Sequence, residues 1–337
     1  MRLNVSTIAG ILAVVVLFGL LQVSLKSTNY DRLVLGLNRP MPLTKIVDFD
    51  PTAVTGVVIG AALGGFREVA ATMLWIKVDE RWDEGKGTEA GTLGLMRSTT
   101  LLDPHWLEPW RIMGWHLAYN LYVETKDPQE QAVLLAKSIA CLKEGISWNP
   151  DVYDLYFELG WTYFDKIKDF ENAAKWLESS IQFEHPEYIE RLIAHAYERL
   201  PDIDKALDWY DYCLKRNPGD HTAAGATITI KERYLRSWRL YKAKQYDAAL
   251  NELNYYMLVS PQDQIGLHLM ATIYEAKGDK RKAYDTWMLA GHARAMDDYA
   301  RFKANALATE NGWPAPPAPR QFLEKSSRQL AAPTHTE

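Results

Sequence analysis

The sequence predicts an all-α protein in which helix-turn-helix repeats stack into a solenoid. Amphipathic segments that end in a proline recur along the chain, and neighbouring members of the series are 32 to 46 residues apart. The series consists of Pro104, Pro150, Pro186, Pro218 and Pro261. Because proline cannot continue a helix, each one marks a turn between successive units. A recurrence at this spacing is typical of stacked helical repeats.

The composition narrows the classes of function. The chain has 337 residues and a formal net charge of -5, so it lacks the basic footprint of a nucleic-acid-binding protein. Its 12 Trp and 18 Tyr fall mostly inside the repeats. Cys141 and Cys213 lie in the second helices of non-adjacent units. We therefore interpret both cysteines as small buried side chains without a disulfide, redox or metal role.

The N-terminus, residues 1–26, is predicted to be a transmembrane signal anchor. Residues 5–25 are nearly all apolar and are about long enough to span a bilayer as a helix. A cleaved signal peptide is the competing interpretation, but no small-x-small cleavage pattern follows Leu21. We expect a single-pass membrane protein. Arg2 before the segment and Lys26 after it leave the side of the soluble body open.

Residues 27–52 are polar and interrupted by prolines, which predicts a linker. Residues 53–103 follow as a helical capping region or divergent repeat. Within them, residues 53–66 are apolar and glycine-rich, and the clean apolar stretch of 14 residues is short for a second membrane span. A buried helix or a helix at the bilayer surface is the favoured interpretation. From Phe66 onward the apolar residues recur at helical spacing.

Residues 104–295 are predicted to hold the solenoid, with about five to six units in the chain. In each unit, small residues let two helices approach closely, and large aromatic side chains fill the space between units. The unit with the best match has its pattern residues at Ile193, Ala194, Tyr197, Ala206, Tyr210 and Pro218. A second unit has them at Tyr156, Leu159, Gly160, Tyr163, Ala173, Leu177 and Pro186. In this pattern the chain resembles the tetratricopeptide-repeat (TPR) family over about residues 65–295.

The resemblance implies that the first helix of each unit lines a concave face that binds an extended peptide or a partner's helix. Trp, Tyr and Arg are also the residue types that dominate binding hot spots. The candidate partner-binding residues are Arg111, Trp115, Phe157, Trp161, Arg191, His195, Tyr234, Trp238, Tyr241 and His268. The alternative for these aromatic side chains is packing between neighbouring units.

No catalytic or ligand motif stands out. The sequence lacks a paired-histidine metalloprotease motif, a CxxC pair, a nucleophile elbow and a phosphate-loop lysine. We therefore expect no enzyme activity, no metal and no cofactor. The favoured function is a membrane-tethered scaffold or adaptor that binds an unknown protein partner, for example in assembly of a membrane or envelope complex. The alternative is an accessory or small-ligand-binding solenoid in envelope polysaccharide or lipid assembly, which predicts one closed, deep pocket.

Residues 296–337 are predicted to form a terminal helix, a proline-rich segment and a flexible tail. The stretch from Trp313 to Pro319 contains four prolines and is typical of polyproline II structure. Two interpretations stay open for it. It is either a free terminus or a docking peptide for an aromatic-lined groove.

Overall fold

The computed structural model describes residues 66–293 and 297–316, and over these residues all regular secondary structure is helical. The predicted all-α class is therefore confirmed for this part of the chain. The predicted anchor (residues 1–26), the predicted linker (27–52) and the tail beyond residue 316 lie outside the described residues.

The predicted single-pass membrane localisation is contradicted. Among the helices in the described ranges, none is both long and apolar enough to cross a membrane. The longest of them is α8 (Pro128–Trp148) with 21 residues. It carries the charged residues Glu130, Lys137, Lys143 and Glu144 along its length. Such side chains are costly at the centre of a bilayer.

Contacts divide the chain into two compact units. The described part of the first unit contains residues 66–116 and 147–149. Its helices are α4 (Arg67–Asp83), α5 (Ala90–Leu102) and α6 (Leu107–Trp115). The carbonyl oxygen of Pro104 accepts hydrogen bonds from Trp110 Nε1 at 2.9 Å and Asn149 Nδ2 at 3.0 Å. Trp110 is fully buried, so this proline turn is part of the unit's core.

The second unit contains residues 117–146 and 150–316, apart from 294–296. Two π-helices belong wholly or mostly to it, η3 (His116–Leu121) and η4 (Tyr163–Ile167). Its α-helices, besides α8 up to Ile146, are α7 (Tyr122–Glu124), α9 (Tyr153–Thr162), α10 (Phe170–Ser180), α11 (Tyr188–Arg199), α12 (Ile203–Arg216), α13 (His221–Arg233), α14 (Leu235–Lys242), α15 (Tyr246–Met257), α16 (Gln264–Lys277), α17 (Lys280–Ala293) and α18 (Asp298–Asn311).

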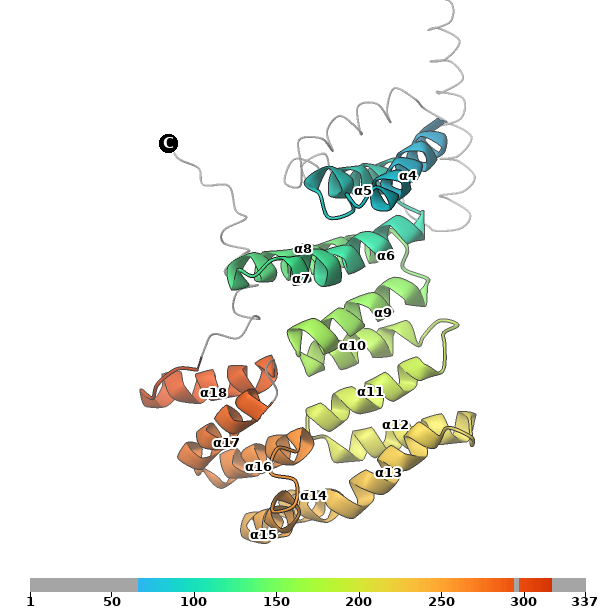
Figure 1. Ribbon diagram of the computed structural model, residues 1–337. Helices are drawn as coiled ribbons and strands as arrows, with labels where there is room; N and C mark the ends of the chain where they lie inside the picture. Colours follow the sequence, from blue (N-terminus) through green and yellow to red (C-terminus); the bar gives the residue numbers. More distant parts are fainter. Residues whose placement is uncertain (1–65, 294–296, 317–337) are drawn as a thin grey trace, which may run out of the picture. The chain divides into compact units, whose positions relative to one another are not determined.

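Consecutive helices of the second unit form hairpins: α9 with α10, α11 with α12, α14 with α15 and α16 with α17 (Figure 1). Small residues allow each pair to approach. Ala194 and Ala206 are fully buried between α11 and α12, as the repeat pattern predicts. Cys141 and Cys213 are both buried and neither forms a disulfide. Burial raises the pKa of the Cys213 thiol to about 11, so it stays protonated.

Aspartates fix the start of many of these helices. In each case the side chain accepts a hydrogen bond from the backbone N–H three residues later, which satisfies one of the free donors of the first turn. The capping residues are Asp169 of α10, Asp202 of α12, Asp220 of α13, Asp263 of α16 and Asp297 of α18.

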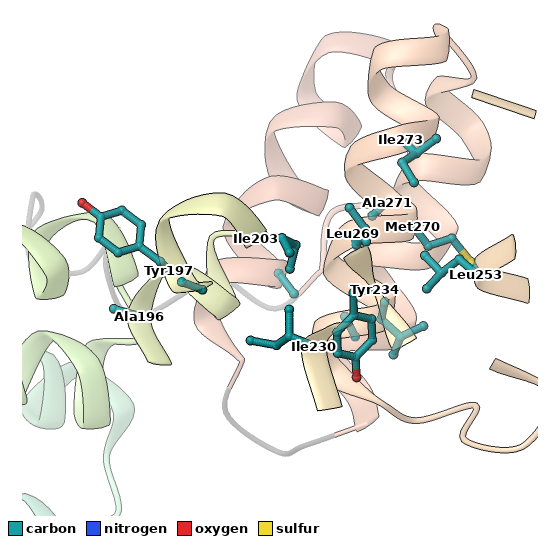
Figure 2. Close-up of a cluster of buried hydrophobic side chains, with 14 of the residues drawn as sticks. Ala196, Tyr197, Ile203, Ile230, Tyr234, Leu253, Leu269, Met270, Ala271 and Ile273 are labelled. Atoms are coloured by element: carbon teal, nitrogen blue, oxygen red, sulfur yellow. The ribbon is translucent and has the colours of Figure 1, made fainter. Parts of the chain in front are cut away.

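One continuous core joins helices of the second unit that lie far apart in the sequence. Figure 2 shows Ile203, Ile230 and Leu269, from α12, α13 and α16, within this cluster. Helix α16 also packs against α11, although four helices separate them in the chain. The helical conformation is interrupted at Tyr234, whose backbone (φ -120°, ψ -29°) separates α13 from α14.

The start of the proline-rich segment is docked on the same chain. The Trp313 ring lies 5.3 Å from the Tyr284 ring of α17, and the guanidinium of Arg281 lies 5.2 Å from it. The hydroxyl of Tyr284 donates to the carbonyl oxygen of Pro314 at 2.6 Å. Trp313 and Pro314 therefore lie against α17 of the same chain, and both interpretations of the proline-rich segment stay predictions.

Candidate functional site

The predicted register of the first helices can be followed in α9, α11 and α14. A small buried residue, Gly160, Ala194 or Ser237, lies on each of them. A Cβ atom on Gly160 would come within 2.8 Å of Leu177 Cγ on α10, and Ser237 Oγ donates to the Ala249 carbonyl of α15 at 2.8 Å. The next residue on each helix is partly exposed: these are Trp161, His195 and Trp238.

The aromatic side chains of α9 contact rings of η4 and α11. The Trp161 ring stacks on the Phe164 ring of η4, with centroids 5.6 Å apart and planes 14° apart. The Phe157 ring meets the Tyr188 ring of α11 edge-on at 5.6 Å. This ring contact joins α9 to the start of α11. Tyr188 is 40% exposed and was missed by the sequence prediction, although it lies one turn before Arg191.

Arg191, on α11, makes an ion pair with a helix cap. Its Nη1 donates to Asp220 Oδ2 at 2.6 Å, while Asp220 Oδ1 accepts from the Ala223 N–H at 3.0 Å. Burial alone would raise the pKa of Asp220, but these hydrogen bonds and the charge of Arg191 outweigh it and hold the pKa below its ordinary value. Asp220 therefore stays ionised at neutral pH.

His195 is held on one side by two polar groups. Its Nδ1 lies 2.7 Å from the Tyr210 hydroxyl and 3.1 Å from Glu198 Oε2. The Tyr210 hydroxyl donates its proton to Glu198 Oε1 at 2.8 Å. Burial, reinforced by Glu198, raises the pKa of Tyr210, so it keeps that proton. In this network, His195 carries a proton on Nδ1. Its other ring nitrogen, Nε2, makes none of these hydrogen bonds.

On α14, Trp238 and Tyr241 repeat the aromatic pair seen at Trp161 and Phe164. Their ring centroids are 5.2 Å apart, and both side chains are partly buried. Lys242 lies over the Trp238 ring at 5.8 Å and donates to Asp204 of α12 at 2.8 Å. Neighbouring side chains of the same protein therefore cover much of the Trp238 and Tyr241 rings, which leaves little of them for a partner.

Tyr234 and His268 do not belong to an exposed face. They are 1% and 0% exposed, respectively. Tyr234 donates to Asp263 Oδ1 at 2.7 Å, whereas His268 lies 2.7 Å from both the Arg199 carbonyl oxygen and Asp297 Oδ2. Burial therefore removes both from the predicted partner-binding set. Tyr234 also contacts the Tyr256 ring of α15, whereas His268 lies on α16 and contacts the rings of Trp287 and Tyr299.

Arg111 and Trp115 belong to the first unit. Arg111 makes two hydrogen bonds to Glu108, at 3.0 and 2.7 Å, and Trp115 is 40% exposed. Their role in partner binding stays a prediction, as it does for the exposed members of the second unit.

Comparison with known families identifies one repeat directly. Residues 153–184, which contain α9, η4 and α10, match the tetratricopeptide repeat. This helix pair is therefore a tetratricopeptide unit, and the neighbouring pairs have a TPR-like organisation. No curated protein matches the chain.

The chain is similar to several solved TPR structures. A thermophilic TPR protein of Thermus thermophilus is 18% identical, covers 52% of this chain and 97% of its own, and gives a TM-score of 0.36. A tetratricopeptide repeat protein from Parabacteroides merdae is 13% identical over 77% of this chain and 98% of its own, with a TM-score of 0.37. YrrB, a TPR protein described as having an unusual peptide-binding site, is 14% identical over 67% of this chain and 98% of its own, with a TM-score of 0.30. At these scores no argument about binding follows.

Proposed function

We propose that this protein is a non-catalytic scaffold that binds a segment of a partner protein through its second unit. The binding surface is formed by Phe157 and Trp161 of α9 and by Tyr188, Arg191 and His195 of α11; we call it the α9/α11 face. Large aromatic and arginine side chains that keep exposed area on adjacent helices are the usual anchors of protein interfaces.

The observation that carries the proposal is the contact between Phe157 and Tyr188. The centroids of the two rings, which belong to different helix pairs, are 5.6 Å apart, and Tyr188 is still 40% exposed. In an arrangement that served only to pack the repeats, this ring would be expected to lose more of its surface. An exposed aromatic patch framed by polar groups is a mark of an interaction site.

Site-specific photo-crosslinking tests the proposal. A benzophenone amino acid replaces Tyr188 or Trp161 in the full chain in its native cells, and adducts are identified by mass spectrometry. The control carries the same group at Tyr212 of α12, which is 48% exposed and belongs to the same unit. We expect one shared protein adduct from positions 188 and 161 that is absent from position 212. Equal labelling from all three positions, or no adduct from 188 and 161, contradicts the proposal.

A further inference from the structure

The end of α18 fixes where the proline-rich segment begins. Gly312 has a left-handed backbone (φ 69°, ψ 29°), and the Trp313 N–H donates to the Ala308 carbonyl oxygen at 3.0 Å, which is the geometry of a Schellman-type helix end. Helices α17 and α18 pack against each other (Figure 1), and an ion pair between Lys280 and Glu310 joins the start of one to the end of the other. The segment therefore leaves α18 beside α17.

The first residues of this segment are restricted to an extended backbone. The rings of Pro314 and Pro316 fix their own φ at about -65°. A residue that precedes a proline is also biased towards extended conformations, and this applies to Trp313, Ala315 and Pro316. The segment therefore favours the polyproline II helix, which has three residues per turn and no internal hydrogen bonds.

Burial along the segment follows this period of three. Trp313 is partly buried and Pro316 is buried, whereas Pro314 and Ala315 between them are exposed. The next position in the same series is Pro319. One edge of a polyproline II helix that begins at Trp313 therefore faces the protein. On this edge, Pro316 and Pro319 form the P-x-x-P pattern of polyproline II ligands.

Helix α17 contacts this edge through a ring, a cation and a hydroxyl. The Arg281 guanidinium lies 5.3 Å from the Tyr284 ring and 5.2 Å from the Trp313 ring, and the two rings are 5.3 Å apart. Asp285 accepts a hydrogen bond from Arg281 Nε at 3.2 Å. The Tyr284 hydroxyl donates to the Pro314 carbonyl oxygen at 2.6 Å. Because a polyproline II backbone cannot pair its own carbonyls, this hydroxyl supplies a bond that the segment lacks.

We propose that Arg281 and Tyr284 form a binding site for a polyproline II segment, which we call the α17 site. Its resident ligand is the segment of the same chain from Trp313 to Pro319, and every third residue of that segment faces the site. Aromatic surfaces bind such segments well because a polyproline II helix loses little conformational entropy on binding. The α17 site is distinct from the α9/α11 face, so the inference goes beyond the proposed scaffold function.

A ligand on the same chain competes strongly with a free one. Trp313 directly follows the end of α18, so no flexible linker separates the resident segment from the helix that carries it. Short connections give effective concentrations of about a millimolar or more. A free proline-rich peptide is therefore expected to occupy the α17 site only when the resident segment has been released.

Fluorescence anisotropy with the full chain measures this competition. The probe is a labelled synthetic peptide with the sequence of residues 313–320. The parent is compared with a Trp313→Ala, Pro316→Gly double variant, the released chain, whose segment lacks two of the facing side chains. We expect the probe to bind the released chain about tenfold or more tighter than the parent. Adding Tyr284→Phe, which removes only the hydroxyl, should weaken that binding about threefold to tenfold.

Variant probes test which edge of the peptide faces the site. Pro316→Ala and Pro319→Ala remove facing rings, whereas Pro317→Ala removes a ring that is out of phase with them. Each change deletes one proline, so each loosens the free peptide to a similar extent. We expect the first two changes to weaken binding to the released chain about threefold or more relative to Pro317→Ala.

Trypsin cleavage after Arg320 reports on the resident segment without a probe. A protease acts on a stretch of chain that has opened, so release of the segment should speed cleavage at this bond. We expect Tyr284→Phe to raise the rate about threefold or more, as measured by mass spectrometry of the intact chain. The control is Lys282→Gln, which removes a cation with 63% of its side chain exposed from the same helix and should leave the rate unchanged.

Each outcome supports or overturns the inference, provided that circular dichroism shows intact helices. Equal binding of the probe to the parent and the released chain, or no binding to the released chain at millimolar probe, overturns the resident-ligand assignment. Binding that is insensitive to Tyr284→Phe places the site elsewhere, and an equal effect of Pro316→Ala and Pro317→Ala overturns the assigned edge. Unchanged cleavage in the Tyr284→Phe chain shows that the segment is not held by this hydroxyl. None of these results alters the crosslinking expected at position 188, so the scaffold function is tested separately.

Discussion

At the scale of single residues, Gly160 sets the distance between the two helices of the tetratricopeptide unit. A Cβ atom at this position would lie 2.8 Å from Leu177 Cγ and 3.0 Å from the Leu177 backbone nitrogen. Both distances are shorter than normal van der Waals contact. Because one of the obstructing atoms belongs to the backbone of α10, a side-chain rotation alone cannot make room.

The substitution Gly160→Ala is therefore expected to lower the free energy of unfolding by about 1 to 3 kcal/mol, the usual cost of an extra methyl group in a packed core. Gly225→Ala on α13 is the matched control. A Cβ atom there meets nothing within 4 Å, so the alanine should stabilise the helix by about 0.5 to 1 kcal/mol. Urea unfolding followed by circular dichroism measures both. A Gly160→Ala protein as stable as the parent would contradict the close approach.

The sequence predicted these close-packed positions because they depend on local rules. A small residue at a fixed offset from a closing proline identifies the contact between two sequential helices, and Gly160, Ala194 and Ala206 are buried as expected. Tyr234 and His268 obeyed the same offsets but are buried, and His268 contacts the end of α11, 69 residues away in the chain. No local pattern contains that information. Tyr188 was missed because only offsets near the small residue were considered.

At the scale of helices, Asp297 connects the start of α18 to α16. Its Oδ1 caps α18 through the Ala300 N–H at 3.0 Å, and its Oδ2 accepts from His268 at 2.7 Å and from Gln264. The other nitrogen of His268 donates to the Arg199 carbonyl of α11 at 2.7 Å. With an acceptor at each ring nitrogen, His268 fits the doubly protonated form, so a buried ion pair joins the three helices.

Because of this ion pair, we expect the free energy of unfolding to depend on pH in the acid range. Burial would raise the pKa of Asp297, but the charge and hydrogen bond of His268, the Ala300 N–H and Gln264 hold it below its ordinary value. A carboxyl with a lower pKa in the folded state adds stability above its unfolded pKa of about 4. That contribution disappears as the pH falls through the folded-state pKa. We expect Asp297→Asn to lower the free energy of unfolding by about 1 to 3 kcal/mol at pH 7. We also expect that free energy to fall less steeply than in the parent as the pH is lowered.

Urea unfolding from pH 7 down to pH 2 measures this difference. Asp247→Asn is the control, because this carboxylate has 78% of its side chain exposed and belongs to a surface ion pair. It should change stability by less than about 0.5 kcal/mol. Parallel curves for the parent and the Asp297→Asn protein would show that Asp297 does not titrate as the geometry requires.

Helix existence and pairing could be predicted from proline spacing and amphipathic periodicity, but some features of the elements could not. The π-helices η3 and η4 depend on i to i+5 backbone hydrogen bonds, which leave no distinct side-chain pattern. The break at Tyr234 divides a segment that reads as one long helix. It is at this break that the second unit departs from a simple succession of repeats.

At the largest scale, the second unit closes on itself. In a linear solenoid each repeat contacts only its neighbours, so distant repeats do not interact directly. Here the Phe170 ring of α10 lies 5.9 Å from the Tyr299 ring of α18, across more than a hundred residues of chain. Tyr299 also contacts His268 at 5.5 Å and Trp287 at 5.7 Å. The tetratricopeptide unit and the terminal helix are therefore expected to be energetically coupled.

Removing this ring tests the coupling. Tyr299→Ala deletes the contacts to Phe170, His268 and Trp287 and should lower stability by about 2 to 4 kcal/mol. Hydrogen–deuterium exchange should become faster in α10 and α16 as well as in α18, because these helices lose a shared contact. Tyr255→Ala, at a ring that is 80% exposed, is the control and should leave exchange in all three helices unchanged. Faster exchange confined to α18 would mean that the terminal helix only rests on the repeats, and that the second unit behaves as a linear array.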